Sequence, residues 1–447
     1  MRAERRGGSR VSLSRSLTVL AAVAALAACE RELILEGERL DPRALSPAGP
    51  VETPPNRIQP IALPAQVNHA AWTHRGGSPT HVITHPALSP QPALMWSAPI
   101  GAGEDRRFRI TADPVVAEGR IFTLDSQATV TATSADGRTL WRTDITAPWA
   151  GRGAGQSGGG LAHADGRLFV TSAYGQLVAL DSASGTELWR HRFDAPVTGA
   201  PAVRGGQVFV VSTDSAAWAL NVADGKVLWQ RDGTPAPASM VGGAAPAVTD
   251  RLVLLPFPSG EVVAKQRDTG AETWRSRVAG RRIGMANAGV TGISGDPVVV
   301  GNTIFVGNRS GRVAALDAGT GALRWSARDG AFGPVWPVGD SLFLISDQGE
   351  LVRLAAASGE RIWAVTLERY LEERERRRAE VVAHYGPVLA GGRLIVASND
   401  GQLRGYDPAS GELVFSGSVP GGATSHPVVV GGVLYVVSRD GRLHAFR

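Results

Sequence analysis

The sequence predicts an all-β fold, an eight-bladed β-propeller built from four-stranded antiparallel blades. The first observation is a repeated unit, clearest between Ser294 and Trp325: three short β-branched runs, each followed by a glycine, and a fourth run that begins at the tryptophan. Short runs of this kind, separated by glycine turns, are typical of antiparallel hairpins. Because one four-stranded sheet cannot bury both of its faces, copies of it are expected to stack in an array.

The second observation is the spacing Gly-x-x-x-Trp, which counts the copies. It occurs at Gly137/Trp141, Gly185/Trp189, Gly225/Trp229, Gly270/Trp274, Gly321/Trp325 and Gly359/Trp363, with Gly411/Phe415 as a seventh copy. In five of these seven copies another glycine stands ten residues before the first one: Gly175, Gly260, Gly311, Gly349 and Gly401. The regular spacing therefore predicts seven complete units.

The third observation is an eighth copy, His426 to Arg447, which carries three strands and no tryptophan. The segment from Leu94 to Ser97, which precedes the first complete unit and contains Trp96, can supply the missing strand. Pairing an N-terminal strand into the last sheet closes the ring and removes an open sheet edge. We therefore expect eight blades, with the last one closed near Trp96.

The aromatic residues of the repeat are predicted to be structural. A large flat ring near the start of an outer strand can lie between neighbouring blades, with its N–H donating to a backbone carbonyl. The glycine four residues earlier suits the positive φ of a hairpin turn. The expected girdle of blade-docking rings consists of Trp96, Trp141, Trp189, Trp229, Trp274, Trp325, Trp363 and Phe415.

Residues 1–28 have the pattern of a secretory leader. They carry a net charge of +4 out of the chain's +5, so the basic composition gives no reason to expect a nucleic-acid partner. The apolar segment that follows the arginines, Leu17 to Ala28, is too short to span a bilayer. It ends in Leu-Ala-Ala-Cys, which resembles a bacterial lipobox and implies cleavage before Cys29 and lipidation of that residue. The alternative is an ordinary secretory signal followed by an incidental cysteine.

Two further segments stand apart from the repeat. Residues 29–70 contain seven prolines after position 40 and no sustained apolar period, which predicts an extended tether between the leader and a propeller that spans residues 71–447. Residues 366–383, TLERYLEERERRRAEVVA, combine good helix formers with Glu–Arg pairs at i,i+4. They predict a short surface helix inserted between the sixth and seventh units.

Some segments suggest ligand chemistry. His74, His81 and His85 could ligate a metal, but their spacing matches no common site. A loop lying across one end of the propeller is therefore the favoured interpretation. The glycine-rich link at residues 148–160 and the long polar link at residues 281–289 are candidates for a binding rim, because such connections gather at one end of a propeller.

The repeat resembles the tryptophan-docking motif of PQQ-type propellers. The residues that carry the resemblance are DAGTGALRW at 317–325, DSASGTELW at 181–189 and DPASGELVF at 407–415. Two groups share this motif: quinoprotein alcohol and sugar dehydrogenases, and the BamB lipoproteins of the outer-membrane β-barrel assembly machinery. The lipobox and the Pro-rich tether are similar to those of the second group, and Glu30 after the cysteine favours the periplasmic face of the outer membrane.

The resemblance to the BamB family implies a scaffold that assists the insertion of β-barrel proteins into the outer membrane. Such a protein is not an enzyme, has no catalytic, cofactor-binding or metal-binding residues, binds the periplasmic domains of the barrel-forming subunit, and meets the membrane through its lipid anchor only.

Two alternatives stay open. A PQQ-dependent dehydrogenase needs a carboxylate base and calcium ligands at the centre of the propeller. Asp113 and Asp296, each followed by proline at the start of an expected inner strand, are the candidates. Many such enzymes hold PQQ over a disulfide of adjacent cysteines, and this chain has only Cys29. The other alternative is a propeller that binds a periplasmic glycan or peptide.

Overall fold

The computed structural model describes residues 55–151, 157–236, 242–278, 280, 292–372, 374, 378 and 380–447. All of these residues belong to one compact unit, 53–447. The leader, Cys29 and the first part of the predicted tether lie outside the described residues.

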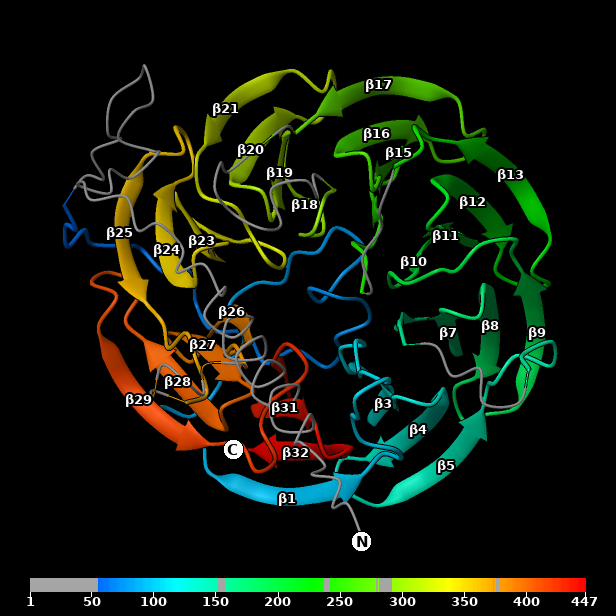
Figure 1. The fold of residues 1–447 in the computed structure, drawn as a ribbon, viewed down its shortest axis with the longest axis horizontal. Helices are drawn as coiled ribbons and strands as arrows, with labels where there is room; N and C mark the ends of the chain where they lie inside the picture. Colours follow the sequence, from blue (N-terminus) through cyan, green and yellow to red (C-terminus); the bar gives the residue numbers. More distant parts are fainter. Residues whose placement is uncertain are drawn as a thin grey trace, which may run out of the picture. The chain divides into compact units, whose positions relative to one another are not determined.

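The described chain forms eight four-stranded antiparallel sheets, which confirms the predicted propeller (Figure 1). Each blade is numbered here by the order in which its innermost strand occurs. Blade 1 contains β2 (Val115–Ala117), β3 (Arg120–Leu124), β4 (Thr129–Ser134) and β5 (Thr139–Asp144); blade 2 contains β6 (Gly159–Ala164), β7 (Arg167–Ser172), β8 (Gln176–Asp181) and β9 (Glu187–Arg192). Blade 3 contains β10 (Ala202–Arg204), β11 (Gln207–Val211), β12 (Ala216–Asn221) and β13 (Val227–Asp232); blade 4 contains β14 (Ala247–Val248), β15 (Leu252–Pro256), β16 (Glu261–Gln266) and β17 (Glu272–Arg277).

The second half of the ring repeats the same order. Blade 5 contains β18 (Val298–Val300), β19 (Thr303–Asn308), β20 (Arg312–Asp317) and β21 (Leu323–Ala327); blade 6 contains β22 (Trp336–Val338), β23 (Ser341–Ile345), β24 (Glu350–Ala355) and β25 (Arg361–Thr366). Blade 7 contains β26 (His384–Ala390), β27 (Arg393–Ser398), β28 (Gln402–Tyr406) and β29 (Leu413–Ser418); blade 8 contains β30 (Val428–Val430), β31 (Val433–Ser438), β32 (Arg442–Phe446) and β1 (Leu94–Pro99).

Blade 8 is closed by the N-terminal strand β1. β1 pairs antiparallel with β32, and Trp96 stands opposite Ala445. Beyond the strands, the backbones of Ala93 and Arg447 exchange two hydrogen bonds of 2.8 and 2.9 Å. The predicted closure near Trp96 is therefore confirmed.

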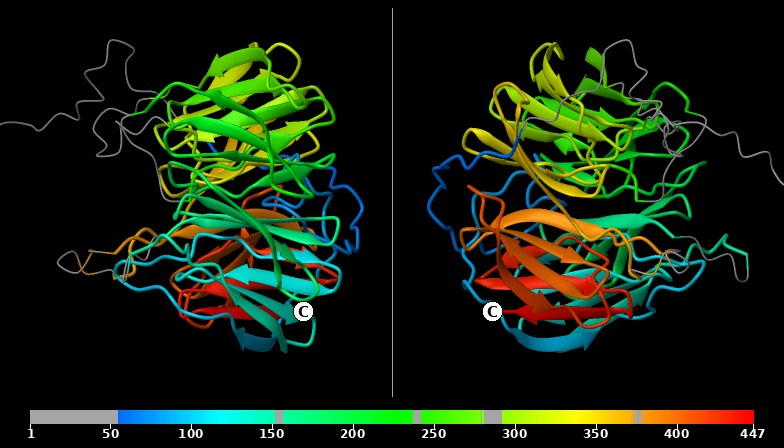
Figure 2. Two further views of the ribbon diagram at one scale, coloured as in Figure 1. Left: turned by 90° about the vertical axis from the view of Figure 1, so that its right-hand side faces the viewer. Right: turned by 60° about the vertical axis from the view of Figure 1, so that its left-hand side comes forward.

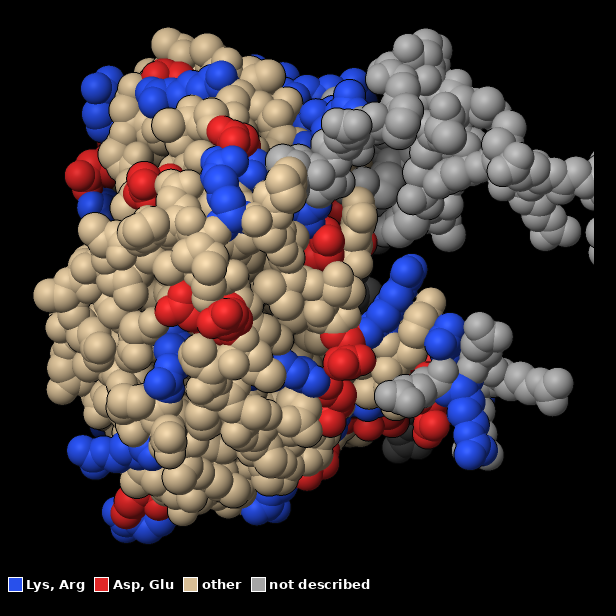
Figure 3. All heavy atoms as spheres, turned by 90° about the vertical axis from the view of Figure 1, so that its left-hand side faces the viewer, with Lys and Arg blue, Asp and Glu red and all other residues tan. Residues whose placement is uncertain are grey.

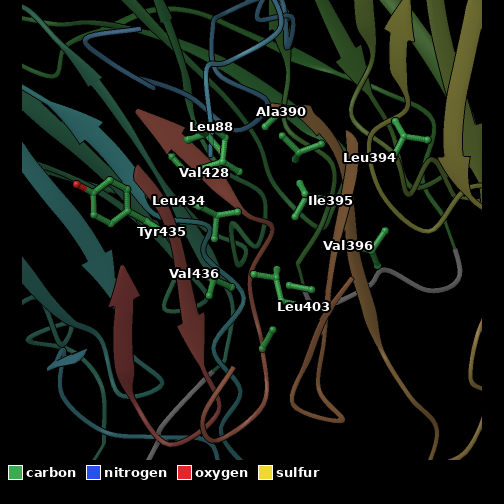
Figure 4. Close-up of a cluster of buried hydrophobic side chains, with 14 of the residues drawn as sticks. Leu88, Ala390, Leu394, Ile395, Val396, Leu403, Val428, Leu434, Tyr435 and Val436 are labelled. Atoms are coloured by element: carbon green, nitrogen blue, oxygen red, sulfur yellow. The ribbon is translucent and has the colours of Figure 1, made fainter. Parts of the chain in front are cut away.

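The core lies between the blades, because the two middle strands of each sheet are buried on both faces. Figure 4 shows one such interface, between blades 7 and 8, where Leu394 and Ile395 from β27 lie in the same cluster as Leu434 and Val436 from β31. All four side chains have an exposed fraction of 1% or less. Complete burial of each stabilises the fold by about 1.5–3 kcal/mol. The outermost strands other than β25, in contrast, carry mostly exposed or half-buried residues, as in β29.

The helix predicted at residues 366–383 is wrong. The described residues of this insertion contain no helix; Tyr370 bridges Val381 in antiparallel fashion, and the amide of Val382 donates to the carbonyl of Arg369 at 3.0 Å. The i,i+4 pairs that suggested a helix contribute only about 0.2–0.5 kcal/mol each, too little to hold a short isolated helix. Instead, the burial of Leu367 and the backbone contacts between residues 369–370 and 381–382 hold the insertion in a hairpin-like conformation. Residues 373, 375–377 and 379 lie outside the described part.

The end of the predicted tether packs on the propeller. From residue 55 onward the chain is described, and the amides of Arg57 and Gln59 donate to the carbonyls of Ile362 and Ala409. The packed part therefore begins well before residue 71. Among the described residues there is no helix with the length and apolar composition that a membrane span requires.

Candidate functional site

Each indole of the girdle bonds to the following blade. The Nε1–H groups donate to backbone carbonyls at 2.8–3.3 Å, in the pairs Trp96–Ala135, Trp141–Ser182, Trp189–Val222, Trp229–Arg267, Trp274–Ala318, Trp325–Ala356 and Trp363–Pro408. Every accepting carbonyl lies in the turn before the next outer strand. The indoles therefore join each blade to the next around the propeller.

The glycine of the Gly-x-x-x-Trp spacing has two separate tasks. Gly359 has φ of +73°, as its turn requires, and a Cβ at this position would lie 2.4 Å from the ring of Trp325 in the preceding blade. Gly321 meets Trp274 at the same distance. The positive φ was predictable from the sequence, but the indole that packs on each glycine comes from the neighbouring blade, so local spacing does not reveal it.

Phe415 is the girdle residue that carries no N–H group. It lies at the junction of blades 7 and 8, and blade 8 has no continuous turn before its outer strand because β32 and β1 come from opposite ends of the chain. The position without a donor therefore coincides with the position where the usual accepting turn is replaced by the paired chain ends.

Two aspartates and one arginine meet at the axis of the ring. Nε of Arg75 lies 3.1 Å from Oδ2 of Asp113 and 3.2 Å from Oδ2 of Asp296. Asp113 precedes β2 and Asp296 precedes β18, so the two carboxylates come from blades 1 and 5, on opposite sides of the ring (Figure 1). The side chains of Arg75, Asp113 and Asp296 are 14%, 8% and 0% exposed. The sequence had singled out both aspartates but not the arginine between them.

The surrounding groups complete this ion-pair network. Asp113 Oδ1 also accepts from the amide of His426 at 2.7 Å, and Asp296 Oδ1 accepts from the amide of Ala245 at 2.7 Å. Burial alone would raise the pKa of Asp113, but the attraction and hydrogen bonds of His426 and the charge of Arg75 outweigh it and lower that pKa to about 2. Burial alone would lower the pKa of Arg75, but Asp296 and Asp113 raise it above its ordinary value. Asp113 and Arg75 are thus held in their charged forms.

The axis does not fit a quinone cofactor with calcium. A guanidinium stands where both carboxylates point, so their charges are already neutralised and a divalent cation there would meet a fixed positive charge. Two cavities among the described residues that Arg75 helps to line measure about 10 Å³ and 20 Å³, which is room for one or two water molecules. Among the described residues, no group of three or more His, Cys, Asp or Glu side chains has the arrangement of a metal site.

A segment that we call the cap, residues 67–88, lies across one end of the ring. Trp72 exchanges two backbone hydrogen bonds with Val116 of blade 1 and stacks on Trp336 of blade 6, with ring centroids 6.2 Å apart. Carbonyls of the cap accept from blade amides in the pairs His69–Gly431, Thr73–His163, Pro79–Val248, Thr80–Val299 and Pro86–Gly391. With His74, which accepts from blade 3, the cap contacts all eight blades. Figure 2 shows this blue segment at the opposite end of the ring from the orange insertion between blades 6 and 7.

The three histidines considered as metal ligands all lie in the cap, and each is hydrogen-bonded to backbone. His74 Nε2 accepts from the amide of Val203 at 3.0 Å, His81 Nδ1 donates to the carbonyl of Pro297, and His85 Nδ1 donates to the carbonyl of Pro64, both at 2.8 Å. Burial lowers the pKa of His74 to about 3 and also lowers the pKa of His81. The neutral rings of His74 and His81 therefore connect the cap to blades 3 and 5, and Nε2 of His85 accepts from the amide of Gly392 in blade 7 at 2.8 Å.

The predicted binding rim is only partly described. Residues 152–156 of the glycine-rich link and the whole of 281–289 lie outside the described residues, as does the lipidation candidate Cys29. On the side drawn in Figure 3, Lys and Arg alternate with Asp and Glu between wide uncharged areas. The outer strands also expose apolar side chains just before their rings, with Leu140, Leu188 and Leu228 each 45–46% exposed.

Comparison with known proteins gives one consistent family. A family model described as "Outer membrane protein assembly factor BamB" matches residues 126–365 and 349–447. A protein named outer membrane protein assembly factor BamB from Moranella endobia (strain PCIT) is 24% identical over 333 residues, which is 72% of this chain and 82% of that protein.

Two solved structures show the same fold. The crystal structure of BamB from Moraxella catarrhalis has a TM-score of 0.65 and 19% identity, over 80% of this chain and 99% of that chain. A quinohemoprotein alcohol dehydrogenase from Comamonas testosteroni has a TM-score of 0.65 and 15% identity, over 84% of this chain and 80% of that chain. At these identities the structural likeness establishes the fold and leaves the choice of function to the residues.

Proposed function

This chain belongs to the BamB family of outer membrane protein assembly factors, and we propose that it serves outer membrane assembly as a lipid-anchored scaffold without enzymatic activity. The proposed anchor is Cys29, and the proposed location is the periplasmic face of the outer membrane. The proposed partner is the barrel-forming subunit of the assembly machinery, through its periplasmic domains.

The observation that favours a scaffold over a quinoprotein enzyme is the pairing of Arg75 with both axial aspartates. A dehydrogenase of the quinoprotein class needs a carboxylate free to take a proton and oxygen ligands free to bind calcium. Asp113 and Asp296 are both engaged with Arg75, and the cap covers that end of the axis. The side chains that could have supplied this chemistry instead hold the cap and two opposite blades together.

The outer strands of the blades offer a surface that can bind a partner through main-chain hydrogen bonds. Every outer strand has one edge with no neighbouring strand in its own sheet, and such an edge can pair with an extended segment through main-chain hydrogen bonds. Exposed leucines beside several of these edges add apolar contact area. We propose that the partner uses these edges together with the links between blades.

Affinity capture from detergent-solubilised membranes tests the proposal. The tagged full chain should recover the barrel-forming assembly subunit, whereas a Cys29→Ser control should recover less because it leaves the membrane. Failure to recover any assembly subunit would contradict the scaffold role. In parallel, the purified chain with PQQ and calcium should reduce no dye in the presence of alcohols or sugars; turnover would establish the enzymatic alternative.

A further inference from the structure

Blade 6 departs from the other blades at the residue that faces the outer aromatic ring. In seven blades this residue is small, in the pairs Ala132–Trp141, Ala179–Trp189, Ala219–Trp229, Ala264–Trp274, Ala315–Trp325, Gly405–Phe415 and Ala445–Trp96. In blade 6 the residue opposite Trp363 is Arg353. Arg353 is 0% exposed, so a long cationic side chain is buried where the repeat uses Ala or Gly.

Arg353 is held almost entirely by backbone carbonyls. Its Nη1 donates to the carbonyl of Gln59 at 2.5 Å and to that of Pro408 at 3.2 Å, and its Nη2 donates to the carbonyl of Pro60 at 3.4 Å. The nearest carboxylate oxygen, on Asp340, is 3.9 Å away and that side chain is 67% exposed. A buried guanidinium needs partners for its N–H groups, and here residues 59 and 60 supply two of them.

Residues 55–60 lie along the outer edge of blade 6, where Figure 1 shows the dark blue start of the described chain beside β25. The amide of Arg57 donates to the carbonyl of Ile362 at 3.1 Å. The side chain of Asn56 bonds to both the carbonyl and the amide of Ala364, at 2.8 and 3.0 Å. These bonds occupy polar groups at the edge of β25 that face away from the rest of its sheet.

Burial confirms that this edge is covered while the equivalent edges are open. Ile362, the residue before the ring, is 1% exposed, whereas its equivalents Met95, Leu140 and Val414 are 46–50% exposed. Trp363 itself is 0% exposed. Ile61 and Leu63 pack against the core cluster that contains these two residues.

We propose that the outer edge of blade 6, together with Arg353, is a docking site for an extended polypeptide segment, and that residues 55–60 of this chain are its resident occupant. The site recognises main-chain oxygens through Arg353 and main-chain polar groups through β25, so it selects an extended backbone more than a particular sequence. Any strand that is to pair with this edge has to displace residues 55–60. The inference deepens the proposed scaffold role, on which its use by a partner rests.

The occupant has an advantage that comes from its connection to the site. A segment tethered close to its site acts at an effective concentration in the millimolar range, so a free peptide competes poorly with it. Weakening the resident segment should therefore expose the site to a peptide in solution. A synthetic fluorescent peptide with the sequence of residues 53–66 is a suitable probe.

The test measures peptide binding to the full chain by fluorescence anisotropy. The variant N56A/Q59P removes the side-chain bonds to Ala364 and the amide that donates to Ala409, and it should bind the peptide at least tenfold more tightly than the wild type. Adding R353A should return binding to the wild-type level. Because seven blades carry Ala or Gly at this position, alanine fits the blade. R353K keeps the charge but loses the planar fork of donors, so adding it to N56A/Q59P should also weaken peptide binding.

The matched control is N56A/Q59P/R324A, which removes an arginine from the outer strand of blade 5 and should bind like N56A/Q59P. Equal binding by N56A/Q59P and N56A/Q59P/R353A, or no gain in N56A/Q59P over the wild type, would overturn the proposal. The assay contains no assembly machinery. If affinity capture fails but peptide binding depends on Arg353, the scaffold role is rejected and the docking site stands. If affinity capture succeeds but peptide binding does not depend on Arg353, the docking site is rejected and the scaffold role stands.

Discussion

Replacing Arg75 by methionine should destabilise the propeller strongly at neutral pH. The change leaves Asp113 and Asp296, 8% and 0% exposed, without the guanidinium that lies 3.1 and 3.2 Å from them. Removing one partner from a buried ion pair costs about 3–5 kcal/mol, because the remaining charge stays buried and unpaired. With an unfolding entropy of about 2.1 cal/mol/K per residue over a unit of this size, the melting temperature should fall by roughly 5 °C.

The loss should depend on pH in a definite direction. In the wild type the pKa of Asp113 is about 2, below its ordinary value of 3.8, so its contribution of about 2 kcal/mol is present above pH 4 and is lost as the pH falls through 2. In Arg75→Met the same carboxylate has lost a positive neighbour, so its pKa rises and it takes up a proton at higher pH. The difference in stability between the two proteins should therefore be smaller at pH 3 than at pH 7.5.

Urea denaturation followed by circular dichroism at both pH values measures this difference. Arg309→Met is the matched control. Burial, and then the charge of nearby Arg75, lower the pKa of Arg309, and its guanidinium lies over the ring of Phe332, 5.5 Å from the ring centroid. Losing that contact should cost less than about 1 kcal/mol. Equal losses in the two variants, or a loss in Arg75→Met that is the same at pH 3 and pH 7.5, would refute the argument.

Three further predictions concern the girdle, the cap and the anchor. Trp325→Phe keeps a ring on Gly359 but removes the N–H that donates to Ala356, so it should lower the free energy of unfolding by about 1 kcal/mol; Trp149→Phe, whose indole bonds to Tyr174 at the surface, should lower it by less in the same urea titration, and equal losses would argue against the docking role. His74 is buried and neutral, with a pKa lowered to about 3, so the stability it contributes is complete above pH 6.5 and falls by about 3 kcal/mol by pH 4.5. Hydrogen exchange corrected for intrinsic rates should show the cap, residues 67–88, opening more at pH 4.5 than at pH 7.5, while the strands of blade 4, which contain no histidine, stay protected; a cap with equal protection at both pH values contradicts this. Cys29→Ser should move the protein from the membrane to the soluble periplasmic fraction, and continued sedimentation with membranes would exclude the lipid anchor.

Much of the fold is written in short-range signals of the sequence. Positive-φ glycines mark the turns, and six girdle indoles and Phe415 each have a glycine four residues earlier along the chain, so seven complete blades can be counted without a structure. Closure by β1 also follows from the sequence, because an unmatched Trp96 precedes the first unit and a unit without tryptophan ends the chain.

The axial site of Arg75, Asp113 and Asp296 could not be predicted from short-range patterns in the sequence. Arg75 meets Asp113 and Asp296 only because the ring brings blades 1 and 5 together under the cap, and no local pattern links these positions. Arg353 is different, since aligning the third strands places it against a column of alanines and a glycine, so a signal was present in the sequence. The helix prediction for residues 366–383 failed for another reason. The Glu–Arg pairs stabilise a helix only weakly, and the tertiary contacts of Leu367 and Tyr370 outweigh them.

The most direct measurement of the central claim is the amount of folded β-barrel protein in the outer membrane of cells depleted of this chain. Folded barrels are counted by the change in electrophoretic mobility between heated and unheated samples. The account predicts a decrease on depletion, restored by the wild-type chain and by Asp113→Asn in proportion to the amount of folded protein. Unchanged barrel levels after depletion would contradict it.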